Sequence, residues 1–513
     1  MKLVKVYGSA VFGINSTLIT IETSVSKGIN FHLVGLPDSA VKESQQRIST
    51  ALQVNAYHMP RQKVVINMAP ADIRKEGAVY DLPLAVSILA ATEQIPDDKI
   101  ENYIIMGELS LDGEVRPIKG ALPIAIQARA HGFDGFILPK ENAREAAVVD
   151  TLKVYGVSNL KEVAGFFKGD NDLQRVEVNT REEFYANVAK QDVDFSDVKG
   201  QENVKRALEI AAAGGHNIIM VGPPGAGKTM LAKRLPSIIP PLTLQESLET
   251  TKIHSVAGKV EKDSGLITRR PFRAPHHTIS DIALVGGGSY PQPGEISLAH
   301  NGILFLDELP EFRRSVLEVM RQPLEERKIV ISRARFSVEY PANFMLTASM
   351  NPCPCGHWNS PDKKCVCPPG TVPKYLSRIS GPLLDRIDIH IEVVPVSFSK
   401  LSEKILSESS ETIRMRVIAA REIQKIRFAN EKGVYCNAMM SSTMLRKYCE
   451  LSEECKNILK TAMERLGLSA RAYDRILKVS RTVADLDCSE NIKPRHLAES
   501  INYRSLDREG WAG

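Results

Sequence analysis

Long apolar runs, internal repeats and low-complexity tracts are all absent from this sequence. No uninterrupted apolar stretch among the 513 residues approaches the roughly 20 residues that a membrane-spanning helix needs. The first residues lack the apolar segment of a secretory signal peptide. Because no repeat of fixed length is present, solenoid architectures are excluded. We therefore expect a cytoplasmic protein without a membrane partner.

The sequence also has little excess charge. Its net charge of +5 permits binding to nucleic acid without requiring it. Charged residues make up 25 % and hydrophobic residues 43 %, values typical of a globular protein. A chain of 513 residues exceeds the size of one hydrophobic core, so we expect roughly two to four domains.

Four segments differ in their patterns. Residues 1–170 alternate short apolar runs with helical periods, which predicts an α/β or α+β domain. Residues 171–198 are polar and weakly periodic, which predicts a linker. Residues 199–395 form a second α/β block, and residues 396–513 are almost entirely helical in period.

A complete phosphate-binding loop lies in the second block. An apolar run over 217–221 predicts a buried strand before it, and 230–235 predict a helix after it. In such a loop the backbone N–H groups surround phosphate, a lysine reaches the β- and γ-phosphates, and a hydroxyl binds Mg²⁺. The sequence therefore predicts an ATP and Mg²⁺ site. The loop residues are Gly222, Pro223, Pro224, Gly225, Ala226, Gly227, Lys228 and Thr229.

Two later strands end in polar residues suited to the same site. The apolar run 303–306 predicts a buried parallel strand that ends at Asp307 and Glu308. We expect Asp307 to hold Mg²⁺ through water and Glu308 to polarise the attacking water. The strand over 344–350 ends at Asn351, whose amide is suited to orienting that water.

The order of these motifs resembles the AAA+ ATPases of the magnesium-chelatase branch. Two further segments carry the resemblance, the sequence Gly-Pro-Leu-Leu-Asp-Arg over 381–386 and Ser-Ala-Arg over 469–471. The resemblance implies that Asn351 is sensor 1, Arg386 an arginine finger that acts on a neighbour's nucleotide, and Arg471 sensor 2. It also implies a ring, expected to be a hexamer. Two alternatives stay open: Arg386 as an ion-pair partner of Asp385 or Asp388, and Arg475 in place of Arg471 at the γ-phosphate.

The N-terminal segment is similar to the proteolytic domain of Lon proteases, an α+β fold of the ribosomal-S5-like kind. Residues 71–77, 106–117 and 137–142 carry this similarity. Val79 stands where that family has its nucleophilic serine, and Leu122 where it has its catalytic lysine. Because an acyl-enzyme needs a nucleophile and a base, we expect an inactive domain kept for binding or assembly.

The whole architecture, with an all-α C-terminal lid, resembles the YifB/ComM family of magnesium-chelatase-like ATPases. Residues 300–312 and 349–356 make this resemblance specific. It implies a DNA helicase or translocase that drives branch migration on branched or single-stranded DNA during recombination of incoming DNA. Two other functions stay open: a chelatase subunit that remodels a partner enzyme, and a protein-remodelling chaperone.

Two segments are candidates to line the pore of a ring. Residues 284–290 place glycines beside an aromatic residue, as expected of a mobile loop. Residues 328–341 predict a hairpin whose turn carries Arg333, Arg335 and Phe336, a combination that suits phosphate contacts and base stacking. An edge hairpin with solvated charges is the alternative.

Half of the eight cysteines lie close together, as Cys353, Cys355, Cys365 and Cys367. Four thiolates in a reducing compartment suit a tetrahedral structural Zn²⁺. The C-x-C spacing is less common in zinc sites than C-x-x-C, so a stiff loop of free thiols stays open as the alternative. We expect the remaining cysteines, Cys436, Cys449, Cys455 and Cys488, to be core residues.

Overall fold

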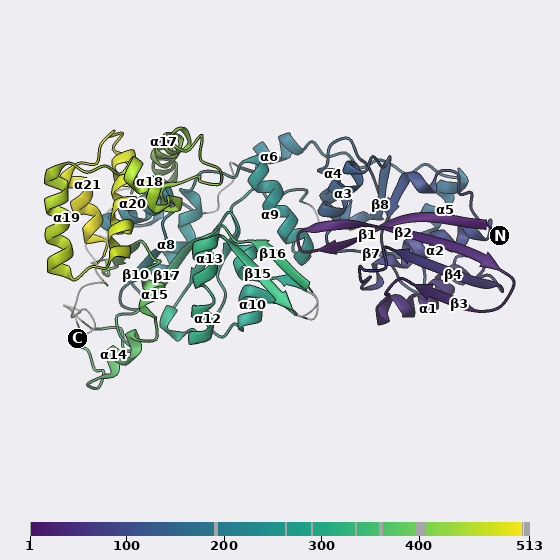
Figure 1. Ribbon diagram of the computed structural model, residues 1–513, viewed down its shortest axis with the longest axis horizontal. Coiled ribbons are helices and arrows are strands. Elements are labelled where there is room, and N and C mark those ends of the chain that lie inside the picture. Colours follow the sequence, from purple (N-terminus) through teal and green to yellow (C-terminus); the bar gives the residue numbers. More distant parts are fainter. Residues whose placement is uncertain are drawn as a thin grey trace.

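The computed structural model is elongated, with the N-terminal residues at one end and the last helices at the other (Figure 1). It describes residues 2–188, 193–261, 264–288, 291–333, 336–358, 363–396, 407–504 and 506. The α/β class with a helical C-terminal region is confirmed. No helix in the described ranges combines the length and apolar character that crossing a bilayer would require.

The N-terminal part is built on a mixed sheet of seven strands in the order β3-β4-β2-β1-β5-β8-β9. A long antiparallel hairpin of β1 and β2, which the sequence patterns did not indicate, pairs from Lys2 opposite Val25 to Phe12 opposite Asn15. The strands are β1 (Lys2–Phe12), β2 (Asn15–Ser26), β3 (Phe31–Val34), β4 (Lys63–Ala69), β5 (Tyr103–Ile105), β8 (Gly135–Pro139) and β9 (Lys153–Val157). The helices are α1 (Ser39–Val54), α2 (Asp81–Ala91), α3 (Ala121–Ala130), α4 (Lys140–Ala147) and α5 (Leu160–Lys168).

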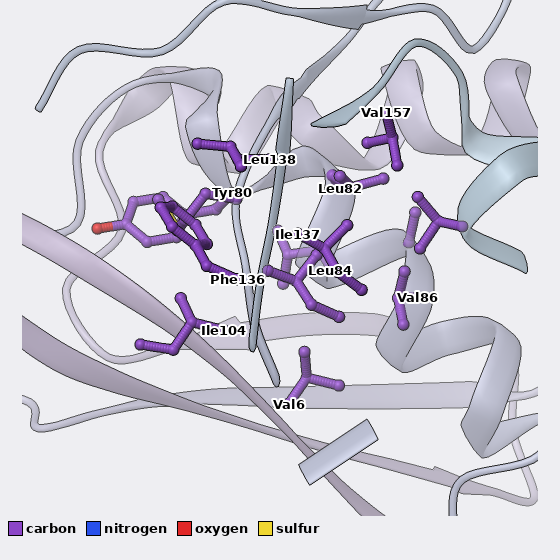
Figure 2. Packing of buried hydrophobic residues seen from close by; sticks show 14 of the residues in the cluster. Val6, Tyr80, Leu82, Leu84, Val86, Ile104, Phe136, Ile137, Leu138 and Val157 are labelled. Carbon is purple, nitrogen blue, oxygen red and sulfur yellow. The ribbon is translucent and has the colours of Figure 1, made fainter. Parts of the chain in front are cut away.

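The core of this part forms around α2, whose residues are all buried. Figure 2 shows Leu82, Leu84 and Val86 of α2 in one cluster with Val6 of β1 and Ile104 of β5. A helix that is apolar on every side must be covered on every side, which explains its place inside the domain. The predicted strands near 64, 103 and 135 and the helices near 82 and 122 are confirmed.

The second sheet has five strands in the order β11-β14-β17-β10-β18, and every pair in it is parallel. Its strands are β10 (Ile218–Val221), β11 (Phe272–Arg273), β14 (Ile303–Leu306), β17 (Met345–Met350) and β18 (Ile389–Glu392). Three of them, β10, β14 and β17, are buried along their whole length, as expected of a parallel sheet covered on both faces, and β10 and β14 are also apolar throughout. Parallel strands share one carboxyl edge, where ligands bind in such sheets.

Several shorter elements surround this sheet. The helices are α7 (Glu202–Gly214), α8 (Lys228–Arg234), α9 (Leu244–Ala257), α10 (Asp281–Val285), α11 (Glu295–Leu298), α12 (Arg314–Glu318), α13 (Arg321–Glu326), α14 (Thr371–Leu376) and α15 (Gly381–Leu384). Two-stranded ladders join β12 (Gly286–Gly287) to β13 (Gln292–Pro293) and β15 (Lys328–Arg333) to β16 (Phe336–Pro341). A further ladder, of β6 (Glu108–Leu109) with β7 (Val115–Arg116), lies in the N-terminal part.

The hairpin predicted over 328–341 is confirmed by the pairing of β15 with β16. Of the residues expected at its turn, Arg335 lies outside the described residues, and Arg333 and Phe336 are described in their backbone alone. Ser289 and Tyr290 of the other pore candidate also lie outside the described residues.

The C-terminal helices are α17 (Ser410–Arg427), α18 (Ser442–Tyr448), α19 (Glu453–Leu466), α20 (Ala470–Leu486) and α21 (Pro494–Asn502). Two of these helices pack on the second sheet, because Val417 of α17 and Val479 of α20 belong to the same hydrophobic cluster as Ile218. The segment predicted as a linker contains a helix, α6 (Thr180–Val188). Whether the predicted segments are independent folding units stays a prediction.

The N-terminal part contacts the part built on the second sheet through α9 (Figure 1). The N–H of Gly120, which precedes α3, donates to the carbonyl of Ser255 on α9 over 3.0 Å. At the tip of the β1–β2 hairpin, Ile14 packs against the hydrophobic cluster of the second sheet. Gly13 lies so close to Val338 of β16 that an added Cβ would be 2.9 Å from its side chain. The N-terminal part therefore touches the hairpin proposed to line a pore.

Candidate ATP site

The phosphate-binding loop follows β10 at the carboxyl edge of the second sheet. Gly225 and Gly227 have φ values of +79° and +86°, which favour glycine. A Cβ built at Gly225 would meet no heavy atom within 4 Å, so open space lies on that side of the loop. The loop thus has the backbone conformation and the room that a bound phosphate group requires.

Lys228 points back across this loop. Its Nζ donates to the carbonyls of Gly222 (2.7 Å) and Pro223 (2.9 Å) and to Oδ1 of Asn351 (3.1 Å). Burial lowers the pKa of Lys228, while the nearby Asp307 and Glu308 act in the opposite direction. The ammonium group is therefore held among neutral oxygens that phosphate oxygens can replace.

The predicted magnesium residues are in contact. The hydroxyl of Thr229 donates to Oδ2 of Asp307 over 2.8 Å. The other carboxylate oxygen of Asp307 accepts from the N–H of Glu308 (3.1 Å) and from the hydroxyl of Ser349. A hydroxyl beside an oriented carboxylate is an oxygen donor set that Mg²⁺ prefers. These residues fit a magnesium–nucleotide complex.

Strand register explains why these residues meet. Val221 of β10 pairs with Met350 of β17, and Leu306 of β14 pairs with Ala348. The residues that follow each strand therefore emerge side by side, as the sequence predicted for Asp307 and Asn351.

Glu308 projects beyond this cluster. Its backbone is left-handed, with φ of +54°, and its side chain is 54 % exposed. Its Oε2 atom is 3.8 Å from Nδ1 of His277. Sequence reasoning missed His277, although the His276–His277 pair is visible in the sequence, and it missed Ser349, which lies two residues before Asn351 and so shares its strand face.

Arg386 lies at the opposite edge of the sheet. It precedes β18, and Ile389 of β18 pairs with Ile218 at the start of β10. The four residues of β10 separate that start from the phosphate loop by about 13 Å. Arg386 is 6 % exposed, and its guanidinium pairs with Glu325 of α13, 2.5 Å away. The ion-pair partner in this chain is thus Glu325, and neither Asp385 nor Asp388.

The candidate sensor 2 arginines are at the same edge as Arg386. Arg471 pairs with Asp385 (3.3 Å), and Arg475 pairs with the buried Asp388 (3.0 Å). Burial alone would raise the pKa of Asp388, but Arg475 and His216 outweigh it and hold that pKa below its ordinary value. The ion pairs of both arginines are thus made within this edge of the sheet, and contact of either one with a γ-phosphate stays a prediction.

The four clustered cysteines converge in space. Their sulfur atoms all lie within 4.8 Å of one another. Of the other cysteines, three are buried as predicted, whereas Cys488 is exposed, so the prediction of a core position is wrong for that residue. Cys488 has a left-handed backbone just after α20 ends, where a helix terminus faces solvent.

The two Lon-like positions offer no reactive groups. Val79 lies in a 3₁₀ turn (Ala78–Tyr80), and Leu122 is fully buried in α3. The N–H of Leu122 donates to Oε1 of Glu145 over 3.0 Å, which fixes the start of α3. Both side chains are hydrocarbon and serve packing.

Comparison with known proteins agrees with the geometry. Residues 194–401 match the family "Magnesium chelatase, subunit ChlI", residues 21–142 match "Subunit ChlI of Mg-chelatase", and residues 407–504 match "Magnesium chelatase, subunit ChlI C-terminal".

Full-length relatives extend these matches. "Uncharacterized protein YifB" of Escherichia coli is 43 % identical over 512 residues, which cover 99 % of this chain and 98 % of that protein. "Competence protein ComM" of Haemophilus influenzae is 42 % identical over 510 residues, with the same two coverages. "Lon protease 2" of Bacillus subtilis is 31 % identical over 159 residues, covering 28 % of this chain and 27 % of that protein. The chain belongs to the YifB/ComM family of magnesium-chelatase-like AAA+ ATPases.

Proposed function

We propose that this protein is a ring-forming ATPase that moves along DNA and drives branch migration during recombination of incoming DNA. The observation that carries the ring is the division of the ATPase residues between two edges of one sheet. The phosphate loop, Asp307 and Glu308 lie at the carboxyl edge, and Arg386 lies at the other. One chain therefore offers a nucleotide site and, on its far side, an arginine that suits the nucleotide of the next chain.

The chain's own residues account for hydrolysis. Lys228 would exchange its carbonyl contacts for the β- and γ-phosphates, and Thr229 and Asp307 would hold the metal. Bound Mg²⁺ supplies charge that neutralises the phosphate oxygens. The exposed carboxylate of Glu308 would orient and polarise the attacking water, and Asn351, which contacts Lys228, would help to orient it. Arg386 of a neighbour would stabilise the charge that develops on the transferred phosphoryl group.

Two features support DNA as the substrate. A relative that is 42 % identical over the full length carries the name "Competence protein ComM", and competence is the uptake of DNA. The hairpin of β15 and β16 has Arg333 at the end of one strand and Phe336 at the start of the other, with Arg335 between them in sequence. Arginine with an aromatic residue suits sequence-independent binding to a strand, which should weaken as salt rises.

The test compares ATP hydrolysis by the purified full chain without DNA, with single strands and with a four-way junction. We expect DNA to stimulate hydrolysis and the junction to be resolved only when ATP is present. Charge reversal of both Arg333 and Arg335 should remove the stimulation and keep basal hydrolysis. Lys328→Glu is the matched control, because Lys328 lies at the base of the same hairpin and pairs with Glu339 at an exposed site.

Other outcomes would refute the proposal. If the chain hydrolyses ATP but neither binds nor responds to any of these DNAs, it is a protein-remodelling ATPase, either chelatase-like or chaperone-like. If Lys328→Glu abolishes the stimulation by DNA as fully as the double reversal does, the stimulation depends on the overall charge of the hairpin, and the turn is not the site of DNA contact.

A further inference from the structure

Four cysteines adjoin the ATP site without taking part in it. Cys353 and Cys355 follow the strand β17, and Cys365 and Cys367 precede the helix α14. The sulfur of Cys353 is 3.3 Å from that of Cys355 and 3.7 Å from that of Cys365, and the latter two sulfurs are 3.5 Å apart. No disulfide joins them, since all four are free.

These separations match a metal site. In a tetrahedron with Zn–S bonds of about 2.3 Å, the sulfur atoms lie about 3.8 Å apart. A disulfide would bring two of them to about 2.0 Å, and unrelated thiols would have no reason to converge as a set of four. The separations of 3.3 to 3.7 Å among Cys353, Cys355 and Cys365 are close to the tetrahedral value, and the sulfur of Cys367 lies within 4.8 Å of all three.

A backbone N–H group is directed at one of the sulfur atoms. The N–H of Trp358 donates to the sulfur of Cys353 over 3.3 Å. Donors of this kind stabilise the negative charge of metal-bound thiolates and orient them. Free thiols would have less need of such donors.

The cysteine loop also touches the nucleotide site at two places. Asn351, which accepts from Lys228, is two residues before Cys353. Gly356 packs on Pro224 of the phosphate loop, since an added Cβ would lie 2.4 Å from its Cδ. The cysteine loop therefore adjoins Asn351, which contacts Lys228, and also packs on Pro224 of the phosphate loop.

A third connection runs through α14, the helix that follows the second cysteine pair. The buried Tyr375 of α14 lies close to the backbone of Asn351, which acts to lower the pKa of the tyrosine hydroxyl against the larger effect of burial. Arg378, just beyond α14, donates to Glu311 (2.9 Å), three residues after Glu308. A metal ion bound to the cysteines would fix the loop that connects Asn351, the phosphate loop and the segment that follows Glu308.

We infer that Cys353, Cys355, Cys365 and Cys367 bind one structural Zn²⁺ and that this metal loop holds Asn351 and the phosphate loop in position for ATP. Zinc binding converts the four thiols to thiolates and releases their protons, with no change of oxidation state. The inference goes beyond the proposed motor, because it requires an ATP site and neither a ring nor DNA.

The first test is metal content. Full-length protein purified without added metal should contain about one zinc per chain, and Cys353→Ser and Cys367→Ser should lose it. Cys488→Ser, which removes an exposed thiol outside the cluster, is the matched control and should keep it. Replacement by Co²⁺ should give the visible absorption of a tetrahedral tetrathiolate site. Folded, ATP-hydrolysing protein without zinc or any other metal on these cysteines would overturn the inference.

The second test separates positioning from mere stability. Gly356→Ala keeps all four sulfur ligands but drives a methyl group into Pro224. Gly370→Ala is the control, because Gly370 has a similar left-handed backbone (φ of +78°, against +82° for Gly356) but open space around an added methyl group. We expect Gly356→Ala to keep its zinc and to raise the KM for ATP by about tenfold, while Gly370→Ala leaves the KM within about twofold of the parent value.

Hydrogen exchange gives a readout that does not depend on activity. Removal of zinc by a chelator should accelerate exchange in peptides covering 222–229 and 351–358, and leave β8 and β9 unchanged. If zinc is present but its removal and Gly356→Ala change neither exchange in the phosphate loop nor the KM, the positioning role is refuted. Failure of DNA stimulation in the same protein would leave these outcomes unaffected, so the two proposals are tested separately.

Discussion

Replacing Arg386 tests whether one ATP site is completed by two chains. Arg386→Ala removes a guanidinium that lies about the length of β10 from its own phosphate loop. An arginine finger in trans contributes about a thousandfold or more to phosphoryl transfer, so hydrolysis should fall at least that far. Binding of ATP to a single chain should persist, because Lys228 and Thr229 are untouched.

The structure also indicates that this variant folds. The partner of Arg386, Glu325, is 52 % exposed, so water can solvate its carboxylate once the arginine is gone. The contact from Asn217 is made to the carbonyl of Arg386 over 3.0 Å, and alanine keeps that carbonyl. Alanine also removes a buried side chain and the donor to the carbonyl of Pro382, so a lowered thermal midpoint with one cooperative transition is expected. Retained ATP binding by the folded variant then separates loss of catalysis from loss of fold.

Mixing two inactive variants gives the decisive measurement. Lys228→Ala chains have no working ATP site but supply an intact Arg386. Arg386→Ala chains have a working ATP site but supply no arginine. At equal and random mixing in a ring, about one interface in four joins a working site to an intact finger, so about a quarter of parent activity should return. The control mixes Arg386→Ala with a chain that carries both substitutions, where no interface is complete. Absence of recovery in rings shown to be mixed would refute action in trans.

Three other predictions follow from the site and its surroundings. Glu308→Gln should bind a fluorescent ATP analogue but release phosphate about a hundredfold to ten-thousandfold more slowly than the parent, whereas Lys228→Ala should lose binding of the analogue. A normal rate of phosphate release in Glu308→Gln would refute the role assigned to Glu308. The N-terminal domain should not cleave casein or a fluorogenic peptide, and cleavage abolished by one substitution in that domain would contradict this. Acid should destabilise the fold, because burial lowers the pKa of three buried histidines below their ordinary 6.5 and the native chain then binds fewer protons than the unfolded chain. As the pH falls below 6.5, each histidine should cost at most about 1.4 kcal/mol per pH unit, until the pH reaches its native pKa. A thermal midpoint that rises between pH 7.5 and 5.5 would contradict that sign; the histidines are His216, His254 and His390.

The ATP site was predictable because its residues follow apolar runs in the sequence. Asp307 and Asn351 each come directly after a strand that is buried on both faces, and parallel strands bring their carboxyl ends together. The glycines of the phosphate loop are fixed by backbone conformation, which is a local property. Local rules therefore sufficed for these residues.

Other contacts depend on elements far apart in sequence. The partner of Arg386 is Glu325 on α13, and nothing within a few residues of either one indicates the pairing. His277 reaches Glu308 only because β11 lies beside β14 in the sheet. The β1–β2 hairpin and α6 were missed because polar residues interrupt their apolar patterns, and tertiary packing overrides such weak local signals.

The opposite edge of the sheet has its own network of buried charges. Asp388, next to the segment of Arg386, is paired with Arg475 of α20 and lies 3.1 Å from His216, whose other ring nitrogen is 2.8 Å from the hydroxyl of Thr482 on α20. Breaking a buried pair leaves an uncompensated charge and costs about 3–5 kcal/mol, so this segment and α20 are held together as one unit. In the proposed ring, the nucleotide of a neighbouring chain would contact Arg386, which belongs to a segment that is already joined to the C-terminal helices. Hydrolysis of that nucleotide would therefore change the position of α20 in the chain that supplies Arg386.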